Sequence, residues 1–398
     1  MTTTETNEVT IEKLVYGGDG LARLDGRVVL TPFVLPGEKA LVASEQSKPD
    51  LLRARIVELK ERSVSRVEPG CPYFGTCGGC HYQHASYEYQ LAQKEAILRE
   101  VLKRVGKLTA PESIGIISSE PWGYRNRTQF HLKRGKIGFL AGGTHNLVPV
   151  DHCPISSPRI NMALQTLREM IRDSRFPNFI SSMELFTNED QVQVNVLDAD
   201  RPVAKRFFEW CAEMITGAAE GSLEYENLRV SHGSFFQVNR FLIGKLVEEA
   251  IGDAAGETAL DLYAGVGLFS LPLARRFRRV TAVESTNSAT TDLAFNAERA
   301  GVRVDIAKQP VEYFLAAAKE PTDFVLADPP RAGLGKRAIE QLVRLKPRNI
   351  TLVACDPATL ARDLGPLTAA GYGISKMTIV DLFPQTYHLE CVVHLGLI

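Results

Sequence analysis

Cys355 and Glu390 are the two residues whose types and surroundings could do chemistry together. Cys355 directly follows the apolar run 350–354, and Glu390 directly precedes the apolar run Cys391-Val-Val. A thiolate can add to carbon 6 of uracil and so make carbon 5 nucleophilic, and a carboxylate can later remove the carbon-5 proton. The pair fits methylation of a pyrimidine ring carbon. The ordinary alternatives are a buried core cysteine and a solvent-exposed strand glutamate.

A glycine turn upstream predicts the site of a methyl donor. The segment Asp261-Leu-Tyr-Ala-Gly-Val-Gly267 lies between a strand pattern at 259–263 and a helical pattern at 268–277. Glycines let the backbone turn tightly beside a ligand, and the carboxylate of Glu284, about 20 residues on, suits ribose hydroxyls. NAD is the rival ligand, but Ser270 stands where a dinucleotide turn has its third glycine. A plain α/β turn is the other alternative.

Asp328-Pro-Pro-Arg331 ends another strand pattern. Two prolines fix the backbone there, and ligands of open α/β sheets lie at the carboxyl ends of the strands. Enzymes that methylate exocyclic amines usually follow Pro-Pro with an aromatic residue, so Arg331 argues against that reaction. A strand-terminating turn without a ligand is the alternative.

The elements that must position these residues form an alternating pattern from Phe241 onward. Helical stretches separate five strand patterns, which predicts an open, mainly parallel, Rossmann-like α/β sheet with strands at 259–263, 280–284, 302–306, 324–328 and 350–354. Cys355 should therefore open onto the same crevice as Asp328.

The rest of the chain predicts three further regions. Short strands with glycine and proline turns between Val9 and Leu59 predict a small five-strand β-barrel, as in oligonucleotide-binding folds. A helix is expected over 87–107, and an α+β region follows with a helix over 160–173 and a strand over 192–197. We therefore divide the chain into a barrel, a cysteine-rich knot with its helix, a central α+β region that is a candidate for RNA binding, and an α/β domain with the methyl-donor turn, at 1–60, 61–108, 109–228 and 229–398.

Three of the seven cysteines, Cys71, Cys77 and Cys80, lie within ten residues. In a chain without a secretion signal such a cluster favours a metal over disulfides. Cys153, followed by a proline as in ferredoxin-type ligation, is the candidate fourth ligand of an iron–sulfur cluster. A zinc site completed by His81, His84 or His152 is the alternative.

Residues 121–148 carry a basic patch without acidic residues. Its cations are interleaved with aromatic residues, a mixture that suits phosphate contacts and base stacking: Arg125, Arg127, Lys133, Arg134 and Lys136, with Trp122, Tyr124, Phe130 and Phe139. A basic strand pair facing solvent is the alternative.

Length and composition limit the number of domains and the class of protein. The 398 residues allow two or three domains, and the formal net charge of −1 argues against a chain that attracts nucleic acid over its whole surface. The N-terminus has no apolar signal region and no stretch is long enough to span a membrane, so we expect a cytoplasmic protein without membrane partners.

Several motifs together resemble one family. The chain is similar to RNA 5-methyluridine methyltransferases of the iron–sulfur type, which have an N-terminal TRAM barrel. The likeness covers nearly the whole length and rests on 122–127 (Trp-Gly-Tyr-Arg-Asn-Arg), 235–239 (Phe-Phe-Gln-Val-Asn), 261–267, 328–331, 355–363 and 383–390.

The resemblance implies roles for individual residues. Cys355 is the nucleophile and Glu390 the base. Contacts to S-adenosylmethionine come from Gln237, Tyr263, Glu284, Asp328 and, near the adenine, Gln309. The [4Fe–4S] ligands are Cys71, Cys77, Cys80 and Cys153. Asp356 replaces an Asn common in the family, and Leu268 replaces a polar residue of the cofactor loop.

The expected activity is methylation of carbon 5 of a uridine in structured RNA by a monomer. Ribosomal RNA is the favoured substrate and the transfer-RNA T-loop the alternative. Cytosine carbon-5 methylation is a rival, although such enzymes usually have Pro before the Cys, whereas here Pro357 follows it. An RNA-binding or RNA-folding protein is the non-enzyme rival, but it would leave Cys355, Asp328 and Glu390 without a reason to coincide.

Overall fold

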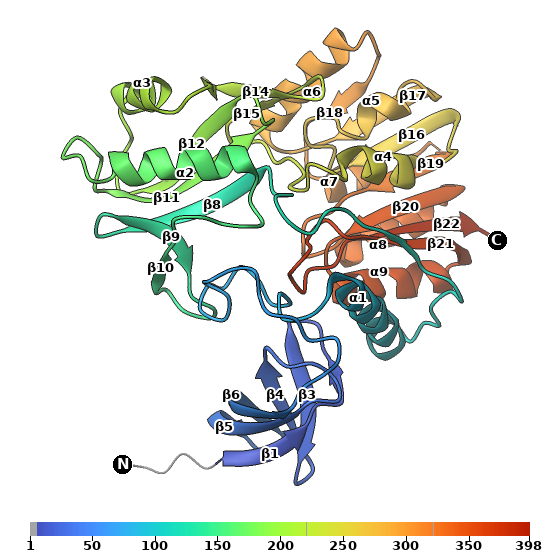
Figure 1. Cartoon of the computed structure of the whole chain (residues 1–398). Coiled ribbons are helices and arrows are strands. Elements are labelled where there is room, and N and C mark those ends of the chain that lie inside the picture. Colours follow the sequence, from blue (N-terminus) through green and yellow to red (C-terminus); the bar gives the residue numbers. More distant parts are fainter. Residues whose placement is uncertain (1–5, 220, 321) are drawn as a thin grey trace. The chain divides into compact units, whose positions relative to one another are not determined.

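The computed structural model describes residues 6–219, 221–320 and 322–398 (Figure 1). Residues 1–5 of the predicted barrel, 220 of the predicted central region and 321 of the predicted methyltransferase domain lie outside the described residues. The chain forms two compact units. The first contains 1–100, 139–148 and 383–388, and the second contains 101–138, 149–382 and 389–398.

The N-terminal strands form one sheet in the order β1-β5-β6-β4-β3-β2. Its strands are β1 (Thr6–Thr10), β2 (Lys13–Leu14), β3 (Asp19–Leu24), β4 (Arg27–Pro32), β5 (Lys39–Lys48) and β6 (Leu51–Glu61). Alternate apolar residues, including Val29 and Val42, fill the core of this sheet. The sequence predicted five strands for this region, whereas the described residues form a sheet of six. The chain bends at Ile11, whose N–H donates to the Glu38 carbonyl, so that β1 pairs with β5 and β2 with β3.

The first unit continues through the cysteine-rich loop into α1 (Tyr87–Val101), and this segment of the unit ends at Glu100. A π-helical turn, η1 (Leu102–Gly106), follows α1 in the second unit. The predicted helix at 87–107 is thus confirmed. Two distant segments close the first unit. The N–H groups of His81 and Tyr82 donate to the carbonyl of Gln385, and the Gln90 side chain bonds Gln385 as well.

The central region of the second unit is built on antiparallel strands. β8 (Arg127–Lys133) pairs with β9 (Lys136–Leu140) and with β11 (Ile180–Thr187), which pairs with β12 (Val192–Ala199). Helix α2 (Pro158–Met170) packs on β11 and β12 (Figure 1). The predicted helix at 160–173 and strand at 192–197 are confirmed. Shorter elements of this region are α3 (Lys205–Met214), β13 (Ala218–Ala219), β14 (Ser222–Tyr225) and β15 (Leu228–Ser231), whereas most of β10 (Leu147–Pro149) belongs to the first unit.

An eight-stranded sheet forms the rest of the second unit, in the order β18-β17-β16-β19-β20-β22-β21-β7. The first five strands are parallel, which confirms the predicted α/β sheet, and β22 runs antiparallel to β20. The strands are β7 (Gly115–Ile117), β16 (Gly256–Leu262), β17 (Phe277–Val283), β18 (Asp305–Ala307), β19 (Phe324–Ala327), β20 (Asn349–Ala354), β21 (Tyr372–Val380) and β22 (Cys391–Leu397).

Helices connect and cover this sheet. α4 (Ile243–Ile251) packs on β20 and β22, whereas α9 (Pro357–Ala369) packs on β20 and β21. The others are α5 (Ser270–Leu273), α6 (Asn287–Arg299), α7 (Val311–Ala317) and α8 (Gly335–Leu345). Within the described ranges, no helix is both long and apolar enough to cross a membrane.

Two local predictions about this sheet are wrong. The helix expected over 268–277 is only the single turn α5, because Phe277 already begins β17 and pairs with Gly256. The strand expected over 302–306 begins later, at Asp305, because only Asp305–Ala307 pair with β17. In both places, tertiary strand pairing overrides the local pattern.

Candidate active site

The glycine turn after β16 bends sharply toward the end of β17. Tyr263, Gly265 and Gly267 have positive φ angles of 64°, 54° and 96°. The Gly265 N–H donates to Glu284 Oε2 (3.1 Å), and the Thr286 N–H donates to Glu284 Oε1 (2.6 Å). The structure thus places the predicted ribose-binding carboxylate directly beside the turn.

Asp261, one residue before the end of β16, is fully buried beneath this turn. Its Oδ2 accepts a hydrogen bond from Ser270, while its Oδ1 has no hydrogen-bond partner among the described residues. Burial raises the pKa of Asp261 to about 7, and the charges of Asp328 and Glu284 add to the rise. An unpaired buried oxygen is costly, so this turn fits a ligand that brings a donor.

Asp328 follows β19 and accepts a hydrogen bond from Gln237 Nε2 at 3.1 Å. The two residues are 91 positions apart, and the structure brings these two predicted cofactor contacts together. Desolvation by burial raises the pKa of Asp328 to about 7, and the bond from Gln237 opposes that rise. Two further predicted contacts are less enclosed: Tyr263 is half-buried, and Gln309, just after β18, is exposed.

Cys355 and Glu390 leave the sheet at the same end. Ala354, the last residue of β20, is the register partner of Cys391, the first residue of β22. Cys355 follows the first of these and Glu390 precedes the second. Glu390 is buried, with 4% of its surface exposed, so the solvent-exposed alternative for this residue is wrong. Cys355 is partly exposed, so the alternative of a buried core cysteine is wrong as well.

Burial raises the pKa values of the acidic groups at this end of the sheet. Burial raises the pKa of the Cys355 thiol to about 12, and the charges of Glu390 and Asp328 raise it further. Burial also raises the pKa of Glu390 well above its usual range, with Asp328 adding to the effect. Arg331 opposes both shifts, because its positive charge favours the ionised forms. The sequence pattern around Arg331 argued against amine methylation but did not predict this electrostatic role.

The loop that carries Arg331 is held by helix α9. Asp363 accepts a hydrogen bond from the Leu334 N–H (2.7 Å), and Arg362 donates to the carbonyl of Ala332 (2.7 Å). Gly333, with φ +74°, passes so close that an added Cβ would lie 2.4 Å from Asp363 Oδ2. α9 begins at the N-cap Asp356, whose side chain accepts from the Ala358 and Thr359 N–H groups. The helix thus joins the cysteine to the Arg331 loop.

The predicted basic patch is divided by the structure. Arg127 is largely buried in an ion pair with Glu184 (2.7 Å), and its Nη1 donates to the Ser234 carbonyl (2.8 Å). Tyr124 and Phe130 are fully buried, so their predicted role in base stacking is wrong. The exposed members are Trp122 and, around the β8–β9 turn, Lys133, Arg134 and Lys136.

The three clustered cysteines lie in one loop of the first unit and are partly exposed. Cys77 Sγ accepts a long hydrogen bond from the Gly79 N–H (3.4 Å), the kind of contact that supports a thiolate ligand. In residues 6–219, 221–320 and 322–398, however, no three His, Cys, Asp or Glu side chains are arranged to hold a metal ion. The side-chain arrangement therefore does not by itself support the predicted iron–sulfur site.

Two families match different parts of the chain. Residues 219–397 match the family described as tRNA (Uracil-5-)-methyltransferase, and residues 2–57 match the TRAM domain. A solved structure also resembles nearly the whole chain. Pyrococcus abyssi tRNA (uracil-54, C5)-methyltransferase in complex with S-adenosyl-L-homocysteine is 27% identical, with a TM-score of 0.75, over 98% of this chain and 100% of that one.

Full-length relatives agree with these matches. The 23S rRNA (uracil(1939)-C(5))-methyltransferase RlmD of Shewanella woodyi is 31% identical, over 96% of this chain and 94% of that protein. An RNA methyltransferase of Aquifex aeolicus is 31% identical over 97% of both chains. With the cofactor turn, the crevice and the N-terminal domain, these similarities show that the chain belongs to the S-adenosylmethionine-dependent RNA (uracil-C5)-methyltransferases with an N-terminal TRAM domain.

Proposed function

We propose that Cys355 and Glu390 carry out the methylation of carbon 5 of a uridine in structured ribosomal RNA. The observation that carries this proposal is the pairing of Ala354 with Cys391, which sets a thiol and a buried carboxyl group at one end of the sheet. Asp328 and Arg331 act electrostatically on both groups.

Each group has one task in the reaction. The Cys355 thiolate adds to carbon 6 of the uracil, and the electron pair of the 5,6 double bond moves toward the carbonyl at carbon 4. When bound, S-adenosylmethionine supplies a methyl group on a positively charged sulfur. After carbon 5 has been methylated, the Glu390 carboxylate removes its proton, the double bond re-forms and the carbon–sulfur bond to Cys355 breaks.

In the absence of substrate and cofactor, the raised pKa values favour the protonated forms of Cys355 and Glu390. The raised pKa of the Cys355 thiol favours its protonated form, which is less readily oxidised than a thiolate. Arg331 is the positive group that favours the thiolate, because it lowers the pKa of Cys355 and of Glu390. Bound cofactor would add a second positive charge to the same crevice and favour both ionised forms further.

The cofactor contacts divide by chemistry. Glu284, already held by two backbone N–H groups, is suited to ribose hydroxyls. Gln237 and Asp328 form a hydrogen-bonded pair beside Cys355 and Glu390 and would bind the polar groups of the cofactor near the reacting carbon. Tyr263 and Gln309 lie at the ends of β16 and β18, on the path we assign to the adenosine.

Ribosomal RNA is the substrate we favour, because the relatives from Shewanella woodyi and Halomonas elongata, 31% and 32% identical over most of their length, act on 23S rRNA by their names. The test is incubation of the purified protein with labelled S-adenosylmethionine and total RNA from a strain that lacks the gene, followed by nucleoside mapping. 5-Methyluridine in ribosomal RNA would support the proposal. The modification in transfer RNA would replace the substrate, and label in cytosine or in no RNA would refute the reaction.

We also propose, from the cysteine spacing and the family resemblance, that Cys71, Cys77, Cys80 and Cys153 hold a [4Fe–4S] cluster. Three soft thiolates in one short loop with a fourth farther along the chain suit iron and sulfide, and zinc is the alternative. No step of the reaction is assigned to the cluster. A cytoplasmic, monomeric protein remains our prediction for the cellular form.

A further inference from the structure

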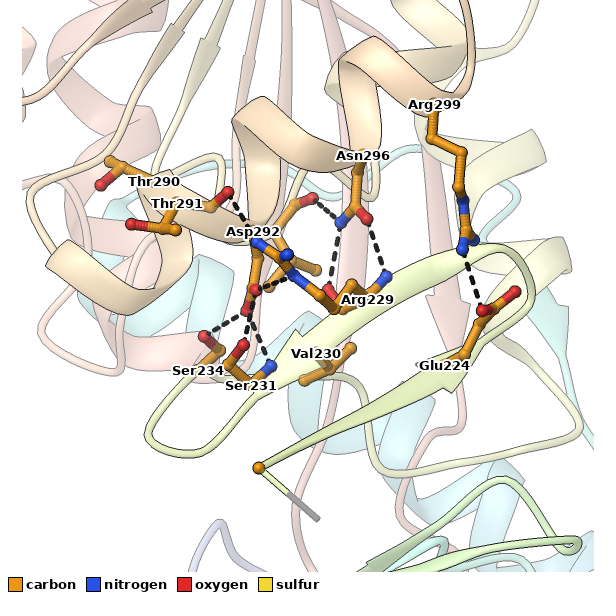
Figure 2. A network of polar contacts seen from close by, with 12 residues as sticks. Glu224, Arg229, Val230, Ser231, Ser234, Thr290, Thr291, Asp292, Asn296 and Arg299 are labelled. Carbon is orange, nitrogen blue, oxygen red and sulfur yellow. Dashed lines mark hydrogen bonds and ion pairs between the residues drawn. The ribbon is translucent and has the colours of Figure 1, made fainter. Parts of the chain in front are cut away.

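A buried polar network joins helix α6 to the β14–β15 hairpin and to the segment that follows it (Figure 2). Its centre is Asp292, whose side chain is completely buried. The carboxylate accepts four hydrogen bonds, from Arg229 Nε (2.8 Å), Ser231 N (2.7 Å), Ser231 Oγ (2.7 Å) and Ser234 Oγ (2.9 Å).

Asn296, one turn later on α6 and also fully buried, reaches toward two elements. Its Oδ1 accepts from the Arg229 N–H (2.7 Å), and its Nδ2 donates to the Arg229 carbonyl (3.1 Å). The side-chain amide thus satisfies both backbone groups of one residue of β15. Its Nδ2 also donates to the carbonyl of Val266 (3.0 Å), inside the glycine turn. One amide therefore ties the cofactor turn to the hairpin.

The segment after the hairpin carries Gln237. Three residues before it, Ser234 is held on two sides, because its hydroxyl donates to Asp292 and its carbonyl accepts from Arg127. The Val238 carbonyl accepts from the Asn126 N–H (3.0 Å), which fixes the segment again just beyond Gln237. Gln237 then donates to Asp328. Its position is thus set by restraints on both sides along the chain.

A network that served only stability would not need a buried carboxylate with four hydrogen bonds. Burying a carboxylate costs free energy, and apolar residues of similar size often stabilise as well as a buried ion pair does. Directional hydrogen bonds instead fix the relative positions of the groups that they join. Here those groups are a carbonyl of the cofactor turn and the segment that bears Gln237, while Glu284 stands three residues before α6 begins.

We propose that Asp292 and Asn296 are positioning residues that hold two walls of the cofactor crevice in register. Asn296 sets the glycine turn through Val266, and Asp292 sets Gln237 through Ser234. Neither residue is assigned a contact with the cofactor. The inference rests on the proposed cofactor contacts of Gln237 and Asp328. It predicts that disrupting the network weakens cofactor binding far more than it weakens RNA binding or the chemical step.

The test measures calorimetric affinity for S-adenosylhomocysteine, thermal stability, RNA affinity and steady-state kinetics of the full-length protein. Asp292→Asn should weaken cofactor affinity at least about tenfold, and Ser234→Ala, which removes a single hydroxyl, about 3- to 10-fold. At saturating S-adenosylmethionine, kcat should return to within about twofold of wild type, because the reacting groups are untouched. RNA affinity should not change.

Tyr372→Phe is the matched control, because it removes one buried hydrogen bond, to the Pro347 carbonyl (2.7 Å), on the distant strand β21. It should lower the melting temperature as Ser234→Ala does and leave cofactor affinity unchanged. Equal cofactor affinity in Ser234→Ala and Tyr372→Phe would overturn the inference, and Ser234→Ala keeps the test decisive where Asp292→Asn fails to fold. Gln237→Ala tests the proposed cofactor contact separately from the positioning role of the network. Unchanged cofactor affinity in that variant would refute the contact itself.

Discussion

Ala354 and Cys391 are register partners across the antiparallel strands β20 and β22, so Cys355 and Glu390 leave the sheet side by side at one end. Thirty-five positions separate the two candidate catalytic residues in the sequence. The distance along the chain is closed by α9 and β21, which return the chain to the sheet. The positions of the proposed nucleophile and the proposed base therefore depend on one strand pairing, and the two roles can be tested separately.

Cys355→Ala should abolish methyl transfer, by at least about 10³-fold in kcat, because carbon 5 is not nucleophilic without the thiolate adduct. Affinity for S-adenosylhomocysteine should stay near that of wild type. The measurement is transfer of labelled methyl to RNA together with calorimetric binding. Cys211→Ala, at a buried cysteine of α3, is the control and should retain activity. Turnover in Cys355→Ala would rule out the nucleophile.

Glu390→Gln should permit methyl transfer but stall before the thiol leaves, because an amide cannot accept the carbon-5 proton. A covalent protein–RNA complex should then accumulate and be visible as a shifted band on a denaturing gel. Glu249→Gln is the control, since Glu249 is a partly buried glutamate that bonds Thr378 (2.6 Å). If Glu390→Gln turns over normally without an adduct, the base is another group.

The stability of the cofactor-free protein should fall as pH rises from about 4 to about 7. Asp328 has a pKa raised from 3.8 to about 7, so the folded state binds more protons than the unfolded state in that window. Each such group then costs about 1.4 kcal/mol of unfolding free energy per pH unit, and the loss ends above about pH 7.

Asp328→Asn should reduce this slope by the share of one group, because Asn does not ionise and can still accept the bond from Gln237, whereas Asp261 and Glu390 still titrate. Urea unfolding at several pH values between about 4.5 and about 7.5 measures the slope. Asp173→Asn is the control: an arginine neighbour lowers the pKa of that surface carboxyl to about 2, so the control should leave the slope as it is. Identical slopes in wild type and Asp328→Asn would contradict the raised pKa.

Gly333→Ala should lower activity more than Gly335→Ala does. Both glycines have φ near +75°, so both substitutions impose similar backbone strain of about 1–3 kcal/mol. Only at Gly333 would the new Cβ collide, at 2.4 Å from Asp363 Oδ2 and 2.7 Å from Arg362, whereas at Gly335 it meets nothing within 4 Å. The collision should displace the Arg331 loop. The comparison requires melting temperatures and kcat for both variants, and equal losses of activity would remove the role assigned to the loop.

Cys77→Ser should remove a metal ligand and lower the metal content of anaerobically purified protein. Iron and acid-labile sulfide, with broad visible absorption, would identify an iron–sulfur cluster, and zinc without visible absorption would identify the alternative. Cys391→Ser, a buried cysteine on β22, serves as the control and should leave the metal content intact. A wild-type protein without either metal would refute the site.

Part of the candidate site was predictable because Asp328, Cys355 and Glu390 each adjoin a strand that the sequence reveals. Buried apolar runs end directly before Asp328 and Cys355, and parallel strands in such sheets share one ligand-binding edge. The contributions of Arg331 and Asp363 could not be predicted in the same way. Their motifs were visible, but an electrostatic effect on Cys355 or a hydrogen bond to Leu334 exists only once α9 and the loop are in place.

The sequence by itself determined the alternation of strands and helices, the reactive residue types and the cofactor turn, because these depend on local pattern and spacing. Only the tertiary structure decided three features: the pairing of Ala354 with Cys391, the burial of Tyr124, Phe130 and Arg127, and the proton affinities of the crevice. Each arises from segments that are distant in the chain, and desolvation depends on everything that surrounds a group rather than on its neighbours in sequence.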